Sequence, residues 1–318
     1  MKQFQFASRA GVGIVVLLVA NSLASAQATR TWVSGVGDDV NPCSRTAPCK
    51  TFAGAISKTA TGGEINCIDP GGFGGVTITK AITIDGNGTH AAILAAGTTG
   101  VIINAPSTAT VTLRNLSING VNGATSPGLD GIRVLQAGNV FIENCTVFGF
   151  NEQGLDYQVT GTTAARLQIK DSVFQRCNTG GIKLTPLAGQ TSTVNAVLDN
   201  VRMEGNSFGF QANDRTKATL RNCSMSGNTA QGMLAFVNLG GATVSVNLEH
   251  CTLANNGSIG IRANAATAVV RLSNTSIFDN AGASIDVAGG GLVQSFVNNQ
   301  IRGNTPDTAP TALVPAQQ

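Results

Sequence analysis

The sequence predicts an all-β fold in which short strands stack in parallel, coil upon coil, as a β-solenoid. The 318 residues include 39 glycines and only 12% charged side chains, a composition that suits tight turns between strands better than helices with charged faces. A unit of strand, polar corner, second strand and a further Asn recurs at intervals of 22 to 29 residues, which indicates a structural repeat. Apolar and polar residues alternate within each unit, as in strands that bury one face.

Composition and charge exclude several other classes. The mean hydropathy of +0.14 and the many Val, Ile and Leu residues provide enough apolar surface for a core, which argues against disorder. The ladder pattern of leucine-rich repeats is absent. A formal net charge of +3 is small for a nucleic-acid-binding domain, which carries clustered Lys and Arg. We therefore expect no nucleic-acid partner.

The first 26 residues have the features of a secretory signal peptide. Lys2 and Arg9 precede an apolar run over residues 10–24, and a small-x-small cleavage site ends at Ala26. Cleavage there leaves 292 residues with 18 basic and 17 acidic side chains. No other apolar stretch approaches about 18 residues, so no membrane span is expected. The sequence thus predicts a secreted or periplasmic protein.

Residues 27–66 are predicted to form an N-terminal helical cap on the solenoid. In CKTFAGAISKTA, Phe52, Ala55 and Ile56 have helical spacing, which predicts a short amphipathic helix. A cap prevents exposed end strands from pairing with other chains. The single solenoid domain is predicted over residues 67–304, and the Pro-, Thr- and Ala-rich residues 305–318 as a flexible tail.

Seven cysteines in an exported chain predict at least one disulfide and at least one free thiol. Cys43 and Cys49 lie six residues apart in a Pro-containing loop and are the best candidate pair. No metal site is indicated, because neither a second CxxC nor a nearby His accompanies them. The pairing of the other five cysteines stays open, and a bridge between Cys223 and Cys251 is one possibility. Burial is expected for all five, which are Cys67, Cys145, Cys177, Cys223 and Cys251.

Two corners interrupt each unit. Asn suits them because it tolerates left-handed backbone and can hydrogen-bond from coil to coil. The first corner is predicted at Asn115, Asn144, Asp171, Asn200, Asn222, His250, Asn274 and Asn298, where His250 substitutes for Asn. The second corner is predicted at Asn151, Asn178, Asn206, Asn228, Asn256, Asn280 and Asn304.

The strand before the first corner alternates between core and solvent. Its inward row is predicted to be Leu113, Ile142, Ile169, Leu198, Leu220, Leu248 and Leu272. The outward row alternates in sign through Arg114, Glu143, Lys170, Asp199, Arg221 and Glu249. Stacked neighbours lie about 4.8 Å apart, so this row predicts an ion-pair ladder that stabilises the register.

A third strand follows the second corner. Its predicted inward row is Ile132, Leu155, Ile182, Phe210, Met233, Ile261 and Ile285. Its predicted outward row is Arg133, Asp156, Lys183, Gln211, Leu234, Arg262 and Asp286. The longer units place their extra residues after this strand, and insertions on one face of a solenoid often flank a binding surface.

The chain resembles right-handed parallel β-helix proteins of the pectate lyase (pectin lyase-fold) superfamily. The resemblance rests on TWVSGVGDDVNPCSRTAPCKTFAGAISKTATGGEINCIDPGGF, on VTITKAITIDG, and on coil repeats of the form Ile-x-Asn-x-x-Ile and Gly-Ile-x-Leu, and it covers residues 31–304. It implies a right-handed parallel β-helix, here of about nine coils. It also implies a carbohydrate-active or polysaccharide-binding role, although fold does not fix function.

The enzymatic signatures of that superfamily are mostly missing. Its polygalacturonase-like members use an Asp cluster with Gly-His-Gly and Arg-x-Lys, whereas the two histidines of this chain, His90 and His250, lie in other contexts. The Asp-Pro-His motif of alginate epimerases is also absent. Asp38 and Asp39 are adjacent but belong to the N-terminal turn.

One group of residues has catalytic potential, and two interpretations of it stay open. Asp130, Arg133, Asp156 and Lys183 are expected to lie close together on successive third strands. In the first, carboxylates hold a calcium ion while Arg133 or Lys183 acts as the base of a uronide lyase. In the second, favoured one, the residues form a surface ion-pair ladder of little energetic value. Calcium enters only under the lyase interpretation, and no other cofactor is expected.

Binding without catalysis is a further hypothesis. Arg133, Asp156, Lys183 and Gln211 would contact a polysaccharide, and an outward Phe148 would offer an apolar platform. The sequence thus predicts an exported protein that contacts or acts on extracellular polysaccharide. The alternative is a structural or adhesive surface rod without catalytic activity, and the oligomeric state stays open.

Overall fold

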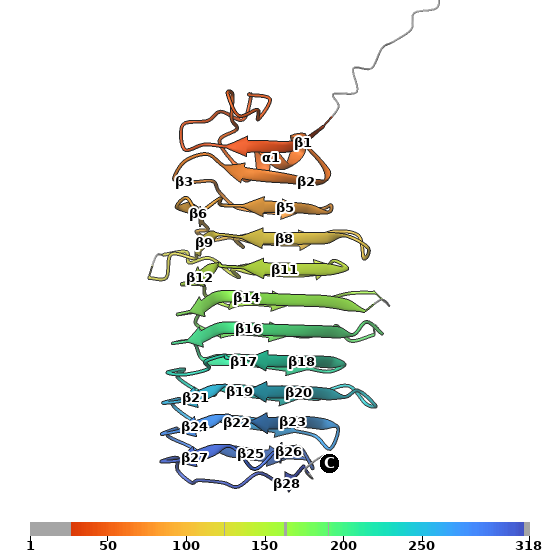
Figure 1. The fold of residues 1–318 in the computed structure, drawn as a ribbon, viewed down its shortest axis with the longest axis vertical. Coiled ribbons are helices and arrows are strands. Elements are labelled where there is room, and N and C mark those ends of the chain that lie inside the picture. The colour runs from red at the N-terminus through yellow and green to blue at the C-terminus, as the bar shows by residue number, and fades with distance from the viewer. Residues whose placement is uncertain (1–26, 124, 162–163, 190, 315–318) are drawn as a thin grey trace, which may run out of the picture.

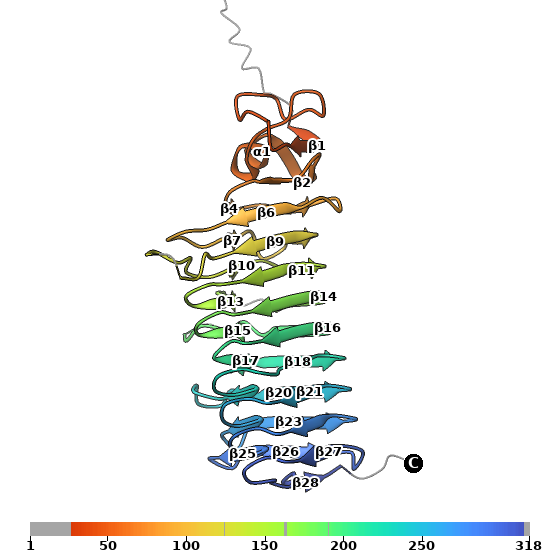
Figure 2. The same cartoon turned by 90° about the vertical axis from the view of Figure 1, so that its left-hand side faces the viewer.

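The protein is an elongated stack of β-coils, seen in a computed structural model that describes residues 27–123, 125–161, 164–189 and 191–314. About ten turns follow one another along the long axis (Figures 1 and 2). Every strand pairing in the described chain is parallel, as a solenoid requires. The predicted signal peptide lies outside the described residues.

Three parallel sheets form the walls of the stack. The main sheet has 16 strands, and its path is β1 (Ala28–Val33), β2 (Thr59–Cys67), β5 (Ile82–Asp85), β8 (Thr110–Arg114), β11 (Asn139–Glu143), β14 (Ala165–Gln175), β16 (Val194–Glu204), β18 (Thr216–Arg221), β20 (Val244–Glu249), β23 (Ala268–Ser273), β26 (Leu292–Ser295) and β28 (Ala312–Leu313). Its side branch is β3 (Gly71–Gly72), β6 (Ala91–Leu94), β9 (Leu116–Asn119) and β12 (Thr146–Phe148).

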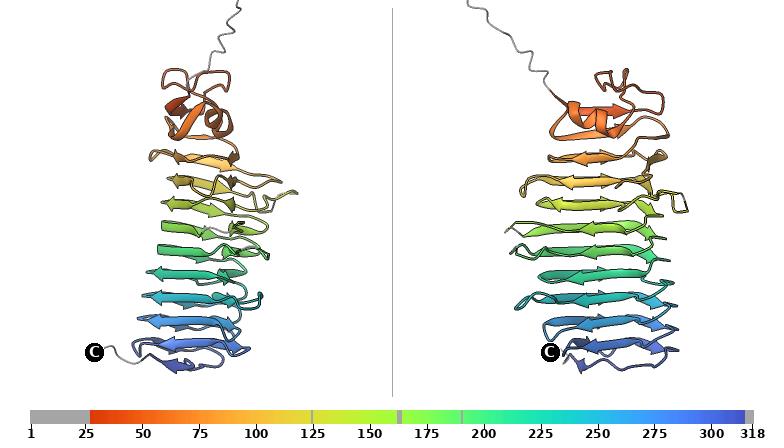
Figure 3. Two further views of the ribbon diagram at one scale, coloured as in Figure 1. Left: turned by 90° about the vertical axis from the view of Figure 1, so that its right-hand side faces the viewer. Right: turned by 180° about the vertical axis from the view of Figure 1, so that it is seen from behind.

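The two other sheets complete the coils. The nine-stranded sheet contains β4 (Val76–Ile78), β7 (Val101–Asn104), β10 (Ile132–Gln136), β13 (Gln153–Tyr157), β15 (Gly180–Leu184), β17 (Phe208–Asn213), β19 (Met233–Phe236), β22 (Ile261–Asn264) and β25 (Ile285–Ala288). The three-stranded sheet contains β21 (Thr252–Ala254), β24 (Ser276–Phe278) and β27 (Gln300–Arg302). The longer connections from the nine-stranded sheet to the main sheet extend from the side of the stack (Figure 3).

The predicted inward rows form the core. All seven residues of the row before the first corner are buried, from Leu113 to Leu272. All seven inward residues of the third strand are buried too, and they stack in register, as Ile132 pairs with Leu155 and Leu155 with Ile182. The period of two therefore assigned the inward face of both strands correctly, because successive side chains of a strand point to opposite faces.

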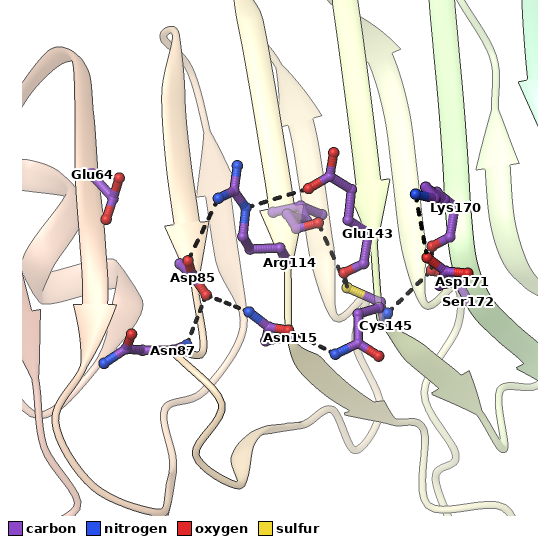
Figure 4. A network of polar contacts seen from close by, with 12 residues as sticks. Glu64, Asp85, Asn87, Arg114, Asn115, Glu143, Cys145, Lys170, Asp171 and Ser172 are labelled. Atoms are coloured by element: carbon purple, nitrogen blue, oxygen red, sulfur yellow. Dashed lines mark hydrogen bonds and ion pairs between the residues drawn. The ribbon is translucent and has the colours of Figure 1, made fainter.

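The predicted charge ladder is in register but only partly ion-paired (Figure 4). Arg114 lies 3.8 Å from Asp85 and 3.5 Å from Glu143. Arg221 lies 3.3 Å from Asp199. Lys170 instead lies 3.8 Å from Asp171, next to it in sequence. Since most of these side chains are exposed, the ladder contributes little stability.

The first corners adopt the left-handed backbone that the Asn pattern predicts. Seven of the eight predicted residues have φ between 46° and 57°, including His250 at 51°. At the eighth corner Val297 has φ 70°, and Asn298 follows it. His250 has the same backbone conformation as the Asn residues of this series. Its exposed ring lies 4.0 Å from Glu249 and, among the described residues, does not make the coil-to-coil hydrogen bond of an Asn side chain.

The second corner was predicted correctly in five coils and wrongly in two. A continuous buried ladder is formed by Asn206, Asn228, Asn256, Asn280 and Asn304, in which each Oδ1 accepts a hydrogen bond from a backbone N–H of the preceding coil. Asn151 and Asn178 are exposed, because they lie seven residues after the predicted first-corner residue, whereas the buried ladder residues lie six residues after it. Phe150 and Cys177 occupy that position, and both are buried.

The N-terminal end carries the one helix of the described chain, α1 (Phe52–Lys58), where the helical spacing predicted it. The Thr51 hydroxyl accepts a hydrogen bond from the Gly54 N–H at 2.9 Å and so caps the helix. Phe52 is buried and lies 5.2 Å from the ring of Phe73, centroid to centroid. The sheet begins before residue 67, because β1 already pairs with β2.

The predicted Cys43–Cys49 disulfide is present in the loop before α1. The other five cysteines are buried free thiols, so Cys223 and Cys251 are not bridged. Burial raises the pKa of Cys67 and Cys145 to about 12. These thiols are small core residues, in agreement with the burial predicted for them.

The prediction of a flexible tail is wrong for residues 305–314. β28 pairs with β26, and the Thr311 N–H donates to the Val293 carbonyl at 2.8 Å. Asp307 accepts hydrogen bonds from the Asn304 backbone and side chain at 2.8 Å. The segment therefore covers the last coil and ends the Asn ladder.

Within the described residues, no helix has the length and apolar character needed to cross a bilayer.

Candidate functional site

The predicted site lies on the outward row of the nine-stranded sheet. Arg133 pairs with Asp156, Asp156 with Lys183 and Lys183 with Gln211 in successive strands β10, β13, β15 and β17. The row therefore places these four side chains one strand apart, about 4.8 Å each.

Two carboxylates of this site are buried beneath an arginine. Asp130 is 0% and Asp156 is 2% exposed, whereas the Arg133 side chain is 35% exposed. The Arg133 guanidinium lies 3.5 Å from Asp130 Oδ2 and 3.9 Å from Asp156 Oδ2. Its Nη2 also donates to Gln158 Oε1 at 3.4 Å. The expectation of a purely superficial ladder is thus wrong at this point, because both acids lie below the surface.

The buried acids are incompletely hydrogen-bonded. Asp130 Oδ1 accepts from the Gln153 N–H at 3.1 Å. Asp130 Oδ2 and Asp156 Oδ1 are buried without a hydrogen-bond partner. Unsatisfied buried polar atoms are uncommon and often mark functional positions. Arg133 is therefore held electrostatically, with about a third of its side chain open to solvent (35%).

Burial also perturbs the acids. The pKa of Asp130 rises to about 6, chiefly because burial disfavours the charged form. The negative charges of Asp156 and Glu152 raise it further, whereas the hydrogen bond from the Gln153 N–H and the charge of Arg133 lower it. Burial likewise raises the pKa of Asp156, against the lowering effect of Lys183 and Arg133. Perturbed acids of this kind cluster at functional sites.

The donor set does not suit the calcium ion of the lyase interpretation. Calcium takes six to eight oxygen ligands, whereas Arg133 occupies the space beside the two buried carboxylates. Across the described ranges, no group of three or more His, Cys, Asp or Glu residues is arranged to hold a metal. Arginine is also a poor base, because a guanidinium group has hydrogen-bond donors and no acceptor.

The rest of the row is open for contacts. Lys183 has no ion pair or hydrogen bond through its side chain in the part of the chain that the structure describes. Gln211 Nε2 donates to Asn213 Oδ1 at 2.9 Å. Arg133, Lys183 and Gln211 thus offer donors along one face, over the buried acids.

Phe148 is not part of this row. It lies on β12, which pairs with β9 and β14 of the main sheet. The guanidinium carbon of Arg176 lies 5.2 Å from its ring centroid, a cation–π contact. The structure therefore separates Phe148 from Arg133, Asp156, Lys183 and Gln211, with which the sequence grouped it.

A second surface feature escaped the sequence reasoning. A groove of about 570 Å³ crosses five strands of the main sheet, from β11 to β20. Arg166 and Lys217 line it together with several amide side chains. The sequence contained a signal for it in the outward residues near the start of these strands. Cations there alternate with neutral side chains and not with acids, in the row Asn139, Arg166, Asn195, Lys217 and Ser245.

Comparison with known proteins identifies the architecture. The family model described as right handed beta helix region matches residues 66–196 and 188–305. The chain is similar to pectate lyase Pel9A (TM-score 0.61, 15% identity, 88% of this chain and 81% of that chain). It is also similar to an alginate lyase from Paenibacillus sp. str. FPU-7 (TM-score 0.58, 14% identity, 90% and 98%) and to the Dettilon tailspike protein (TM-score 0.50, 13% identity, 90% and 68%). No curated protein matches the chain. At these identities the structural likenesses show the fold alone.

Proposed function

The chain belongs to the right-handed β-helix family, and on that premise we propose that it is an exported protein that binds polysaccharide through the nine-stranded sheet. The observation that carries the proposal is the partly exposed side chain of Arg133, held over the buried Asp130 and Asp156. A fixed, partly exposed guanidinium is well suited to a carboxylate, which it can bind through two parallel hydrogen bonds.

The family context supports this choice of ligand. Two of the similar structures are a pectate lyase and an alginate lyase, whose names state that they act on pectate and on alginate. Both polymers carry carboxylates. In this chain Lys183 lies two strands from Arg133 on the same row, and Gln211 lies one strand further. A polymer running along the stack would meet two cations and then a neutral amide.

Binding is favoured over cleavage. A lyase needs a base, and the guanidinium group of an arginine is a donor only. Lys183 is then the remaining candidate base, and the calcium ion of the lyase interpretation lacks ligands. The site suits recognition of a carboxylate-bearing sugar by a preorganised cation.

A polysaccharide panel screened for both binding and cleavage tests the proposal. Polygalacturonate and alginate are expected to bind without formation of unsaturated products. Arg133→Gln is expected to weaken binding about tenfold or more, because a hydrogen bond to a charged group contributes roughly 1.5 to 3 kcal/mol. Arg262→Gln is the matched control, since Arg262 belongs to the same outward row but lies two strands beyond Gln211.

Two outcomes would contradict the proposal. Equal losses in Arg133→Gln and Arg262→Gln would show that binding depends on overall charge. A folded protein that binds no polysaccharide of the panel would favour the structural or adhesive rod.

A further inference from the structure

The groove on the main sheet is separate from the proposed site. Its floor is formed by the outward faces of β11, β14, β16, β18 and β20, which lie one above another in Figure 1. Four strand spacings give it a length of about 19 Å along the stack. The nine-stranded sheet contributes no residue to its lining.

Cations alternate with neutral side chains along one row of this groove. The row runs through Asn139, Arg166, Asn195, Lys217 and Ser245, which pair in register from strand to strand. Arg166 and Lys217 are exposed, and no acidic residue lines the groove. Throughout the described residues, neither side chain has an ion pair or a hydrogen bond.

The contrast with the charge ladder on the same strands is informative. Lys170 lies on β14 with Arg166, and Arg221 lies on β18 with Lys217. Opposite charges separate the cations of that ladder, which favours the stacking of the coils. Amides separate the cations of the groove, so its positive charge stays uncompensated and does nothing for the stack.

The second row of the groove has apolar and amide surface. It runs through Phe141, Gln168, Val197, Thr219 and Asn247, again in register. Val197 is 39% exposed. Amides exchange hydrogen bonds with hydroxyl groups, and an apolar side chain packs on the C–H face of a sugar ring.

We infer that this groove is a second glycan site, which binds a linear acidic oligosaccharide with a carboxylate on every second sugar. Arg166 and Lys217 lie two strands apart, roughly 10 Å, and Asn195 lies between them. An extended sugar unit is about as long as one strand spacing. Alternating acidic and neutral sugars would therefore meet alternating cationic and amide side chains.

The charge density argues against a nucleic acid. Each strand of a DNA duplex carries a phosphate at about every 3.4 Å, and the groove offers two unpaired cations over its whole length. The described aromatic lining is Phe141, which falls short of the stacking platforms that bind unpaired bases.

Titration with three oligosaccharides of equal length tests the inference. They are hyaluronan hexasaccharide, in which uronate and neutral sugars alternate, a hexagalacturonate, in which every sugar is charged, and neutral cellohexaose. The hyaluronan hexasaccharide is expected to bind most tightly. Arg166→Gln and Lys217→Gln should each weaken its binding about tenfold, while Lys170→Gln and Arg221→Gln, on the same two strands, leave it unchanged.

Arg133→Gln separates this site from the one proposed above, and it should leave binding of the hyaluronan hexasaccharide intact. A loss in Arg133→Gln would place the ligand on the nine-stranded sheet and overturn the inference. Because polygalacturonate is also expected at the Arg133 site, the three probes are compared in Arg133→Gln, and equal or tighter binding of the hexagalacturonate there would overturn the alternating spacing. Equal losses of binding in the groove variants and in the charge-ladder variants would show that binding depends on net charge alone, which overturns the inference. Absence of binding for all three probes would overturn it as well.

Discussion

Asp130 is a buried acid whose ionisation opposes folding. Its pKa in the folded protein is about 6, against an ordinary value of 3.8, mainly because burial disfavours the carboxylate. A carboxyl group with a raised pKa stabilises the protein fully below its unfolded pKa and loses that contribution as the pH rises through its folded pKa. Between about pH 4 and 6 the protein therefore loses stability through Asp130.

Replacement of Asp130 by Asn removes this pH dependence. Asn keeps an oxygen that can accept from the Gln153 N–H but cannot ionise. The melting temperature of the variant should rise relative to that of the wild type as the pH increases from 4 to 6.5. Thermal melts across this range measure the difference.

Asp307 provides the control for that experiment. Hydrogen bonds from Asn304 lower the pKa of Asp307. Its contribution to the free energy of unfolding is therefore complete once the pH exceeds the ordinary pKa of an Asp, near 4. The difference between Asp307→Asn and wild type should stay constant over the same range. A constant difference for Asp130→Asn as well would show that Asp130 is not a buried acid with a raised pKa.

The Asn ladder is the main polar element inside the stack. Asn256 Oδ1 accepts from the Asn228 backbone N–H at 3.1 Å and from its side chain at 3.0 Å. Asn256 Nδ2 donates to the Met225 carbonyl at 3.0 Å and to Asn280 Oδ1 at 2.7 Å. The Asn256 amide thus connects three successive coils.

Asn256→Ala should therefore lower the free energy of unfolding by about 2 kcal/mol or more, because it leaves buried donors and acceptors without partners. Asn151→Ala is the matched control, since the sequence pattern places both residues at the second corner. Asn151 is exposed, so its loss should stay within about 0.5 kcal/mol. Denaturant unfolding measures both, and equal losses would mean that the buried ladder has no special role.

This pair also shows where sequence reasoning stops. Strand faces and first corners were predictable because a strand has a strict period of two and because left-handed backbone selects Asn. It was not predictable that Phe150, and not the adjacent Asn151, occupies the buried ladder position of its coil, since the Asn pattern does not distinguish two neighbouring residues of one turn. Likewise, the sequence placed Asp156 on the outward row, but its burial depends on the arginine and loops that cover it.

At the scale of the whole molecule, the coils form a rod of about ten turns whose two ends need protection. The last main-sheet strand before the C-terminal segment is β26, and its Val293 is 0% exposed. Val293 owes part of its cover to residues 305–314, because Thr311 exchanges hydrogen bonds with its backbone at 2.8 and 3.0 Å. An uncovered β26 would present unpaired backbone groups and apolar surface, which promotes edge-to-edge association.

Truncation after Asn304 should therefore cause the rods to associate end to end. The shortened chain loses β28 and the Asp307 carboxylate that ends the Asn ladder, so the last coil becomes a template for another chain. Light scattering coupled to size-exclusion chromatography should detect species larger than those of the full-length protein, in amounts that rise with concentration. Truncation after Val314 retains every contact described for the segment and should behave as the full-length protein. If both truncations match the full-length protein in mass and in melting temperature, residues 305–314 do not protect the end of the rod, and the last coil must resist pairing by other means.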